Sequence, residues 1–229
     1  MTQDDRGRPR SEQVPHARHE RTERHRWSAL TTVVLLIAGQ GWIATRLGLE
    51  PWWVLPLLTG ACAAGSWIAV LIPGRNRFID RALGVALVRL LAVGTVVSTL
   101  VFVTRVFLGS GLSSAELVLT GAVLWSQSVG VFGMAYWEID GGGPVDRATR
   151  GTGTRWSDFM FPQQQPDVMA TWSPSFGDYL YVSLTNATAF SPTDTMPMSP
   201  RAKLVMGVQS VTSATIVGVL VARAVNIAR

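Results

Sequence analysis

Long apolar segments separated by short polar ones dominate this chain, and the apolar positions fill whole segments instead of one helical face. They run over residues 27–47, 52–72, 83–108, 115–137 and 204–224. A helix rises about 1.5 Å per residue, so about 20 residues cover a hydrocarbon core about 30 Å thick. Helices that are apolar on all sides belong in lipid or in a very large core. The pattern therefore predicts an all-α, polytopic membrane protein with about five transmembrane helices.

The polar segments divide the chain into four parts. Residues 1–26 are arginine-rich and nearly free of aliphatic side chains, which is typical of a disordered tail. Residues 27–138 are expected to form a four-helix transmembrane region, and residues 139–175, rich in Gly, Pro and Gln, a polar loop. Residues 176–229 are expected to form a half-helix followed by the final transmembrane helix.

Composition narrows the classes of function. Hydrophobic residues make up 48% of the 229 residues and charged residues 15%, and the net charge of +5 is carried almost wholly by arginines at the ends of apolar blocks. Membrane topology requires that placement, so no nucleic-acid partner is expected. All three histidines lie in the tail and Cys62 is the only cysteine. Nucleophile–base pairs and zinc sites lack their parts, so we expect no enzyme, no catalytic residue, no metal and no cofactor.

The distribution of basic residues predicts an orientation. They gather before the first block and between the second and third blocks: Arg21, Arg24, Arg26, Arg75, Arg77 and Arg81. The intervening turns, "GLEP" and "GSGLSSA", carry neither arginine nor lysine. The positive-inside rule then places the N-terminus in the cytoplasm, and with it the loop of residues 139–175.

Polar side chains inside the blocks are candidates for function. Arg89 is either an anchoring group or a voltage-sensing charge, and Arg105, sixteen residues further, does not continue the every-third spacing of a sensor. Gln127, in the middle of the fourth block, is expected to join helices or to line a substrate path. Glu138 and Asp140, at the end of that block, are expected to face water.

The segment "DYLYVSLTNATAFSPTDTMP", residues 178–197, begins like a membrane helix and ends in proline-punctuated polar residues. Ser173 before Pro174 predicts a helix start, and a helix over 174–187 is only half a membrane thick. Non-helical backbone at membrane depth is tolerated only where it is buried in protein or faces water. We therefore expect a re-entrant or broken half-helix. The pore and filter candidates are Ser183, Thr185, Asn186, Thr188, Ser191, Thr193 and Asp194.

The final block supplies a second set of candidates, for which plain helix packing and the lining of a path are both open. Small side chains recur at every fourth position, which favours close helix contact, and polar groups lie beside them. The candidates are Gln209, Ser210, Thr212, Ala214, Gly218 and Ala222.

Two paths of residues 176–200 agree with the sequence. A hairpin that re-enters from the cytoplasm is favoured if Arg201 and Lys203 lie inside, and a broken sixth span if Arg223 and Arg229 do. We expect the re-entrant path.

Two resemblances follow from these motifs. "YLYVSLTNATAFSPTD" followed by "MSPRAKLVMGVQSVTSATIVGVLVARAVN" resembles the pore-helix, filter and inner-helix unit of two-transmembrane potassium-type channels. Ser183, Thr185 and Asp194 match loosely, but no glycine occurs from Tyr179 to Met206, whereas that family's filter relies on glycines. "DFMFPQ", then "DYLYVSLT", a polar run and a final helix are similar to the bacterial membrane-protein family designated domain of unknown function 1345. That resemblance implies a helical protein of the bacterial inner membrane and brings no established activity.

The sequence thus predicts an integral membrane protein with an ion-channel-like pore module. It would conduct ions or small solutes, and its partners would be the lipid bilayer and further copies of the chain, as a homo-oligomer. The alternative is a non-transporting membrane scaffold whose basic tail binds a partner or anionic lipid.

Overall fold

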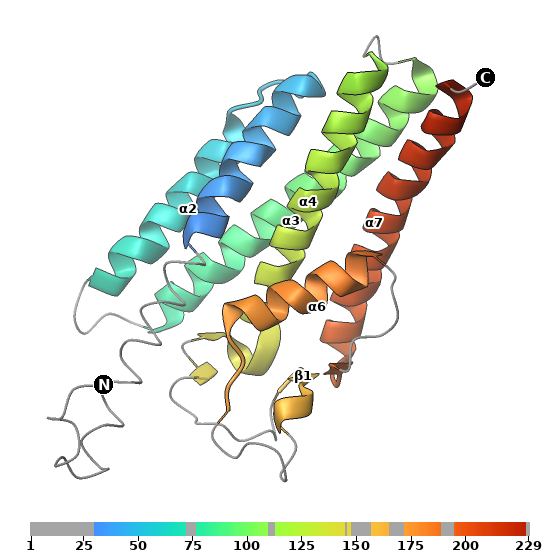
Figure 1. The fold of residues 1–229 in the computed structure, drawn as a ribbon. Coiled ribbons are helices and arrows are strands. Elements are labelled where there is room, and N and C mark those ends of the chain that lie inside the picture. Colours follow the sequence, from blue (N-terminus) through green and yellow to red (C-terminus); the bar gives the residue numbers. More distant parts are fainter. Residues whose placement is uncertain are drawn as a thin grey trace, which may run out of the picture.

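The fold is a bundle of long helices crossed near one end by a short one (Figure 1). The computed structural model describes residues 30–71, 77–109, 113–144, 146–147, 157–164, 172–188 and 195–227. A first helix, Leu30–Arg46, is followed along the chain by α2 (Val54–Leu71), α3 (Arg77–Leu108), α4 (Ser114–Ile139), the short α6 (Phe176–Thr188) and α7 (Pro200–Ile227).

Small elements join the long helices near α6. They are η2 (Asp140–Gly142), β1 (Phe159–Met160), η4 (Pro162–Gln164) and β2 (Met196–Pro197). β1 and β2 pair antiparallel, with Phe159 opposite Pro197. This pairing ties the loop that precedes α6 to the segment that precedes α7.

Within the described residues, three helices are long and apolar enough to cross a membrane: Arg81–Leu108, Ser114–Gly142 and Pro200–Arg223. The expected all-α fold with membrane-type helices is therefore confirmed at this level. Two further apolar stretches of helix are shorter in the described part of the chain: the first helix, Leu30–Arg46, and residues Val54–Ser66 of α2. The count of five spans is not confirmed.

The start of α6 differs from the expectation at Ser173 and Pro174. The helix begins at Phe176, and the Asp178 carboxylate accepts hydrogen bonds from the Ser175 N–H and from Ser175 Oγ, both at 2.7 Å. A carboxylate in the first turn satisfies groups that a helix start leaves open. This cap places the start two residues beyond the predicted one.

Apolar packing puts α4 in the middle of the bundle. One cluster joins the first helix, α3, α4 and α6 through Leu36, Leu91, Val131 and Phe176. An aromatic cluster packs α4 against β1 and α6 through Tyr136, Phe159, Phe161 and Tyr179. A third cluster joins the first helix, α3, α4 and α7 through Ile43, Phe102, Leu124 and Ile216.

A glycine allows α6 to lie directly on α4. A Cβ at Gly133 would come within 3.2 Å of the Leu180 Cα, and backbone atoms cannot move aside as a flexible side chain can. Glycine at this position therefore sets how closely the two helices approach.

The direction of α6 is fixed by its contacts. Its residue Tyr179 reaches Asp140, where α4 ends, whereas Asn186 reaches Gln209, more than two turns into α7. The chain is back beside Asp158 at Ser199, immediately before α7 begins. We call the end of the bundle where α4 ends and α7 begins the Asp140 end.

Candidate functional site

Two groups of polar side chains hold α6 in place. The terminal cluster, at the Asp140 end, consists of Asp140, Arg147, Ser157, Asp158, Tyr179, Ser199 and Arg201. The central network, deeper in the bundle, consists of Ser128, Tyr136, Ser183, Asn186, Gln209, Ser210 and Ser213. The first contains ionised groups, whereas the second contains only amides, hydroxyls and a phenol.

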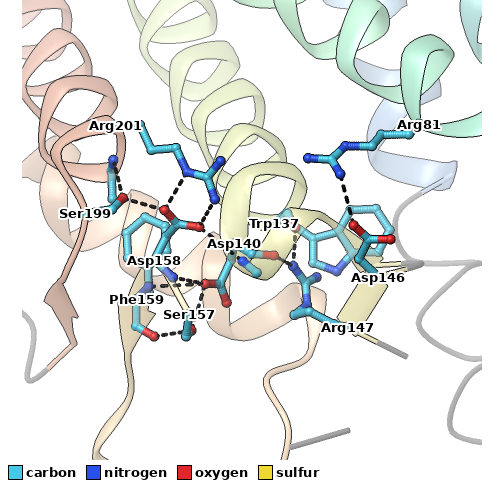
Figure 2. A network of polar contacts seen from close by, with 12 residues as sticks. Arg81, Trp137, Asp140, Asp146, Arg147, Ser157, Asp158, Phe159, Ser199 and Arg201 are labelled. Carbon is cyan, nitrogen blue, oxygen red and sulfur yellow. Dashed lines mark hydrogen bonds and ion pairs between the residues drawn. The ribbon is translucent and has the colours of Figure 1, made fainter. Parts of the chain in front are cut away.

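Asp140 is the buried acceptor of the terminal cluster (Figure 2), with 0% of its surface exposed. Its Oδ1 accepts hydrogen bonds from Ser157 Oγ at 2.8 Å and from the backbone N–H groups of Asp158 and Phe159 at 2.6 and 3.2 Å. Its Oδ2 accepts a hydrogen bond from the Tyr179 hydroxyl of α6. A buried carboxylate with several donors is well compensated. Asp140 therefore ties the loop before α6 and the start of α6 to the end of α4.

Asp158 is the second buried carboxylate and binds the other end of the segment. Arg201 of α7 donates to it through Nε and Nη2, both at 2.6 Å, and Ser199 Oγ also donates to it. Burial by itself raises the pKa of Asp158, but the hydrogen bonds from Arg201 and Ser199 outweigh it and hold the pKa below its ordinary value. The paired, ionised form of Asp158 therefore fastens the start of α7 to the same loop.

Glycines shape the turn that brings the two carboxylates together. Gly141, Gly142 and Gly143 have φ values of 56°, 89° and 96°, a region that favours glycine. The turn lets the Gly141 N–H donate to Asp158 Oδ2 at 3.1 Å. The run of three glycines after Asp140 is thus required by backbone geometry.

Arg147 closes the terminal cluster on the side of α4 (Figure 2). Its Nη1 donates to the backbone carbonyls of Trp137 at 2.7 Å and Asp140 at 2.5 Å. Its guanidinium lies 5.2 Å from the centre of the Tyr179 ring. An arginine that binds the last carbonyls of a helix stabilises the helix end, as in a C-cap.

Gln209 is the centre of the central network and is fully buried. Its Nε2 donates to the Ser183 carbonyl at 2.9 Å and to Ser183 Oγ at 2.7 Å, while its Oε1 accepts from the Tyr136 hydroxyl. Ser183 Oγ in turn donates to the Val129 carbonyl of α4 at 2.7 Å. One side chain of α7 thereby joins α6 to α4.

Asn186 extends the network along α6. Its Nδ2 lies 3.0 Å from both the Met206 carbonyl and Gln209 Oε1, and its Oδ1 accepts from Ser210 Oγ at 3.1 Å. The Asn186 side chain therefore joins α6 to α7 at three positions of α7, Met206, Gln209 and Ser210. Neutral donors and acceptors of this kind satisfy each other at depth without the cost of burying an ion.

Three consecutive residues of α4 bind three different elements. Gln127 Nε2 donates to the Leu36 carbonyl of the first helix at 3.0 Å, Ser128 Oγ lies 3.3 Å from Ser213 Oγ of α7, and the Val129 carbonyl accepts from α6. Gln127 therefore joins helices, one of its two predicted roles. The other role, lining a path, stays a prediction.

Six further candidates, five from the predicted filter and Thr212 from the final block, divide into two sets. The hydroxyls of Thr185, Thr188 and Thr212 donate to carbonyls of their own helices, as hydroxyls in membrane helices commonly do, and do not join the central network. Ser191, Thr193 and Asp194 lie outside the described residues.

The small residues of α7 do not pack against the bundle. Ala214, Gly218 and Ala222 are exposed, and a Cβ at Gly218 would have nothing within 4 Å. Ser210, which shares their spacing, is half-buried and binds Asn186. The stripe therefore faces outward from a single chain. Arg89 is exposed as well.

The expectation that Asp140 faces water is wrong. Its carboxylate is buried because the glycine turn folds the loop of residues 157–161 over it and supplies the donors. Asp158, Tyr179 and Arg201 were not among the sequence candidates. The motifs "DFMF" and "SPRA" contain two of them, but nothing in their spacing indicates that they meet.

Comparison of the chain with protein-family models, curated proteins and solved structures found no match in any of the three. The resemblances to potassium-type pore units and to the domain of unknown function 1345 family therefore stay predictions.

Proposed function

We propose that this is a multi-pass protein of the bacterial inner membrane in which residues 176–200 form a re-entrant hairpin, entered from the cytoplasmic side. Both ends of the hairpin meet at the terminal cluster, through Tyr179 at one end and Ser199 at the other. α6 has 13 residues, about 20 Å of helix, which is less than a hydrocarbon core of about 30 Å. These contacts favour a hairpin over a broken sixth span.

The proposed orientation places the Asp140 end in the cytoplasm. Arg81, Arg147, Arg201 and Lys203 lie in the elements that begin or end there. The first helix and α2 then complete five spans, with the N-terminus inside and the C-terminus outside.

We further propose that the hairpin, α4 and α7 form a path for ions or small polar solutes. The central network is the observation that carries this proposal. A half-helix reaches toward the middle of a membrane, where burying polar side chains is costly. Such side chains are commonly retained for function. Here those of α6, Ser183 and Asn186, turn toward α4 and α7 and away from the outer surface. A path would therefore run inside each chain, with copies associating through outward faces such as the α7 stripe.

A flux assay in liposomes tests the proposal. Purified protein is reconstituted with an entrapped dye for monovalent cations, and in parallel with an osmotic readout for small neutral solutes. Gln209→Leu should reduce flux about tenfold or more, because it removes the centre of the network. The matched control is Thr212→Val on the same helix, whose hydroxyl binds only its own helix and whose loss should leave flux within about twofold. Absence of flux for every ion and solute would overturn the proposal.

A second candidate, a non-transporting scaffold, is favoured by one observation. The groups of the central network satisfy one another, as they would in a purely structural contact. Deleting residues 1–26 separates the two functions: a scaffold that uses its basic tail should lose binding of anionic vesicles, whereas a pore should keep its flux.

A further inference from the structure

The buried amide of Gln40, on the first helix, stands apart from every other polar group described above. The residue is 2% exposed, and both Nε2 and Oε1 lack a hydrogen-bond partner among the described residues. Buried amides in proteins are nearly always paired, either with protein groups or with ordered water. Gln40 therefore points to a partner that the side chains around it do not supply.

Glycine makes the space that this amide occupies. A Cβ at Gly94 of α3 would lie 1.8 Å from Gln40 Nε2 and 3.6 Å from Leu55 Cδ1 of α2. The amide thus lies at the junction of the first helix, α2 and α3, against a residue with no side chain. The adjacent Thr95 hydroxyl donates to the Leu91 carbonyl at 2.9 Å, so its hydrogen is already engaged.

A second glutamine provides the comparison. Gln127 of α4 also lies over a glycine, because a Cβ at Gly39 would come 2.6 Å from its Oε1. Its Nε2, however, donates to the Leu36 carbonyl at 3.0 Å. Both buried glutamines lie against a glycine, but of the two only Gln127 has a hydrogen-bond partner among the described residues.

The chemistry of the site defines its occupant. An amide offers one donor group and one acceptor, so the occupant must accept and donate a hydrogen bond. A charged occupant would be costly among apolar neighbours such as Leu55. The amide nitrogen packs closely against Gly94, which favours a small occupant.

We propose that the Gln40 amide binds a buried water molecule at the junction of the first helix, α2 and α3. The water satisfies both ends of the amide and forms a polar site separate from the hairpin. The proposal does not depend on the transport function.

Water-edited solid-state NMR of the full chain in lipid nanodiscs tests this site. Magnetisation is transferred from water protons to side-chain amides of protein labelled with ¹⁵N and ¹³C, and the Gln40 signal is assigned through its neighbours Gly39 and Gly41. The Gln40 amide should gain signal several times faster than the matched buried amide of Gln127, whose Nε2 has a protein partner. Gln40→Met should remove the fast signal. If that variant does not fold, the sequential assignment through Gly39 and Gly41 still identifies the Gln40 signal in the natural chain.

Two results would overturn the proposal. Slow build-up at Gln40, no faster than at Gln127, would mean that no water is bound there. Fast build-up at Gln127 as well as at Gln40 would mean general hydration of the bundle interior and no specific site.

Discussion

The terminal cluster and the central network both hold the short helix α6, but they do so with different chemistry. At the Asp140 end, two buried carboxylates receive hydrogen bonds from arginine, serine, tyrosine and backbone N–H groups. Deeper in the bundle, Gln209 and Asn186 receive and donate bonds among neutral groups alone. The charged groups lie where part of the terminal cluster reaches solvent, because the Arg201 side chain is 53% exposed. Around the fully buried Gln209, the polar groups are amides and hydroxyls.

The difference follows from the cost of removing charge from water. An ion near the end of a membrane helix can keep part of its hydration, whereas an ion at depth must be fully compensated by protein. Amides and hydroxyls lose less on burial and still give directional contacts. Removal of one partner should therefore be more harmful in the terminal cluster than in the central network.

Asp140→Ala should give the largest loss of stability. It leaves the Tyr179 hydroxyl and two backbone N–H groups without their buried acceptor, which we expect to cost about 3–5 kcal/mol. Thermal unfolding in detergent, followed by tryptophan fluorescence, measures the change. The matched control at the opposite end is the exposed Glu116→Gln, because glutamine preserves the capping box with Ser113 and should change the stability far less than Asp140→Ala. Equal losses for the two variants would contradict the role of Asp140.

Gln209→Leu should cost less, about 1–3 kcal/mol, because neutral groups are left unpaired and the new side chain refills the space. The same unfolding measurement applies, with Thr212→Val on the same helix as the control at less than about 1 kcal/mol. If Gln209→Leu were as harmful as Asp140→Ala, the distinction between the two groups would be wrong.

Gly133→Ala tests whether α6 is positioned by close contact with α4. The added methyl group meets the Leu180 backbone at 3.2 Å, so the helices must separate, at a cost of about 1–2 kcal/mol. Gly218→Ala, with nothing within 4 Å of the new Cβ, should be neutral or stabilise by up to about 1 kcal/mol through helix propensity. Both effects can be measured by unfolding. A neutral Gly133→Ala would mean that α6 is not held against α4.

Acidification should weaken the terminal cluster by the smallest amount, because the Arg201 partner of Asp158 is half exposed and solvent screens the pair. The pKa of Asp158 is lower in the folded chain than in the unfolded one, where it is about 3.9. Its contribution is therefore complete above the unfolded pKa and is lost as the pH falls through the folded pKa. The difference in unfolding midpoint between the natural chain and Asp158→Asn should shrink between pH 5 and pH 3 (about one decade on either side of the unfolded pKa). A difference that stays constant would contradict this assignment.

The sequence predicted the helices well because lipid-type segments are apolar on every side. It also predicted that α6 is a short helix, since prolines and hydroxyls follow Thr188. Ser183, Asn186 and Gln209 were candidates, and the structure brings them together. Thr185 and Thr188 were also candidates, but hydroxyls can bind their own helix, and sequence does not distinguish the two outcomes.

The terminal cluster could not be predicted in the same way. Asp140 and Asp158 lie on opposite sides of a long polar segment, and their meeting depends on positive φ angles at three glycines. A run of glycines indicates an unusual turn without indicating which residues it joins. The cap at Ser175 in place of Ser173 has a similar origin, because it depends on where the Asp178 carboxylate reaches.

The partners of α6 also impose an order on biosynthesis. Ser183 and Asn186 bind Gln209, Met206 and Ser210, all of which leave the ribosome after α6. Unpaired polar groups are costly in hydrocarbon, so a newly made α6 has no stable place at depth until α7 has entered the membrane beside it. In the proposed topology, the half-helix therefore inserts only after α7 has entered the membrane.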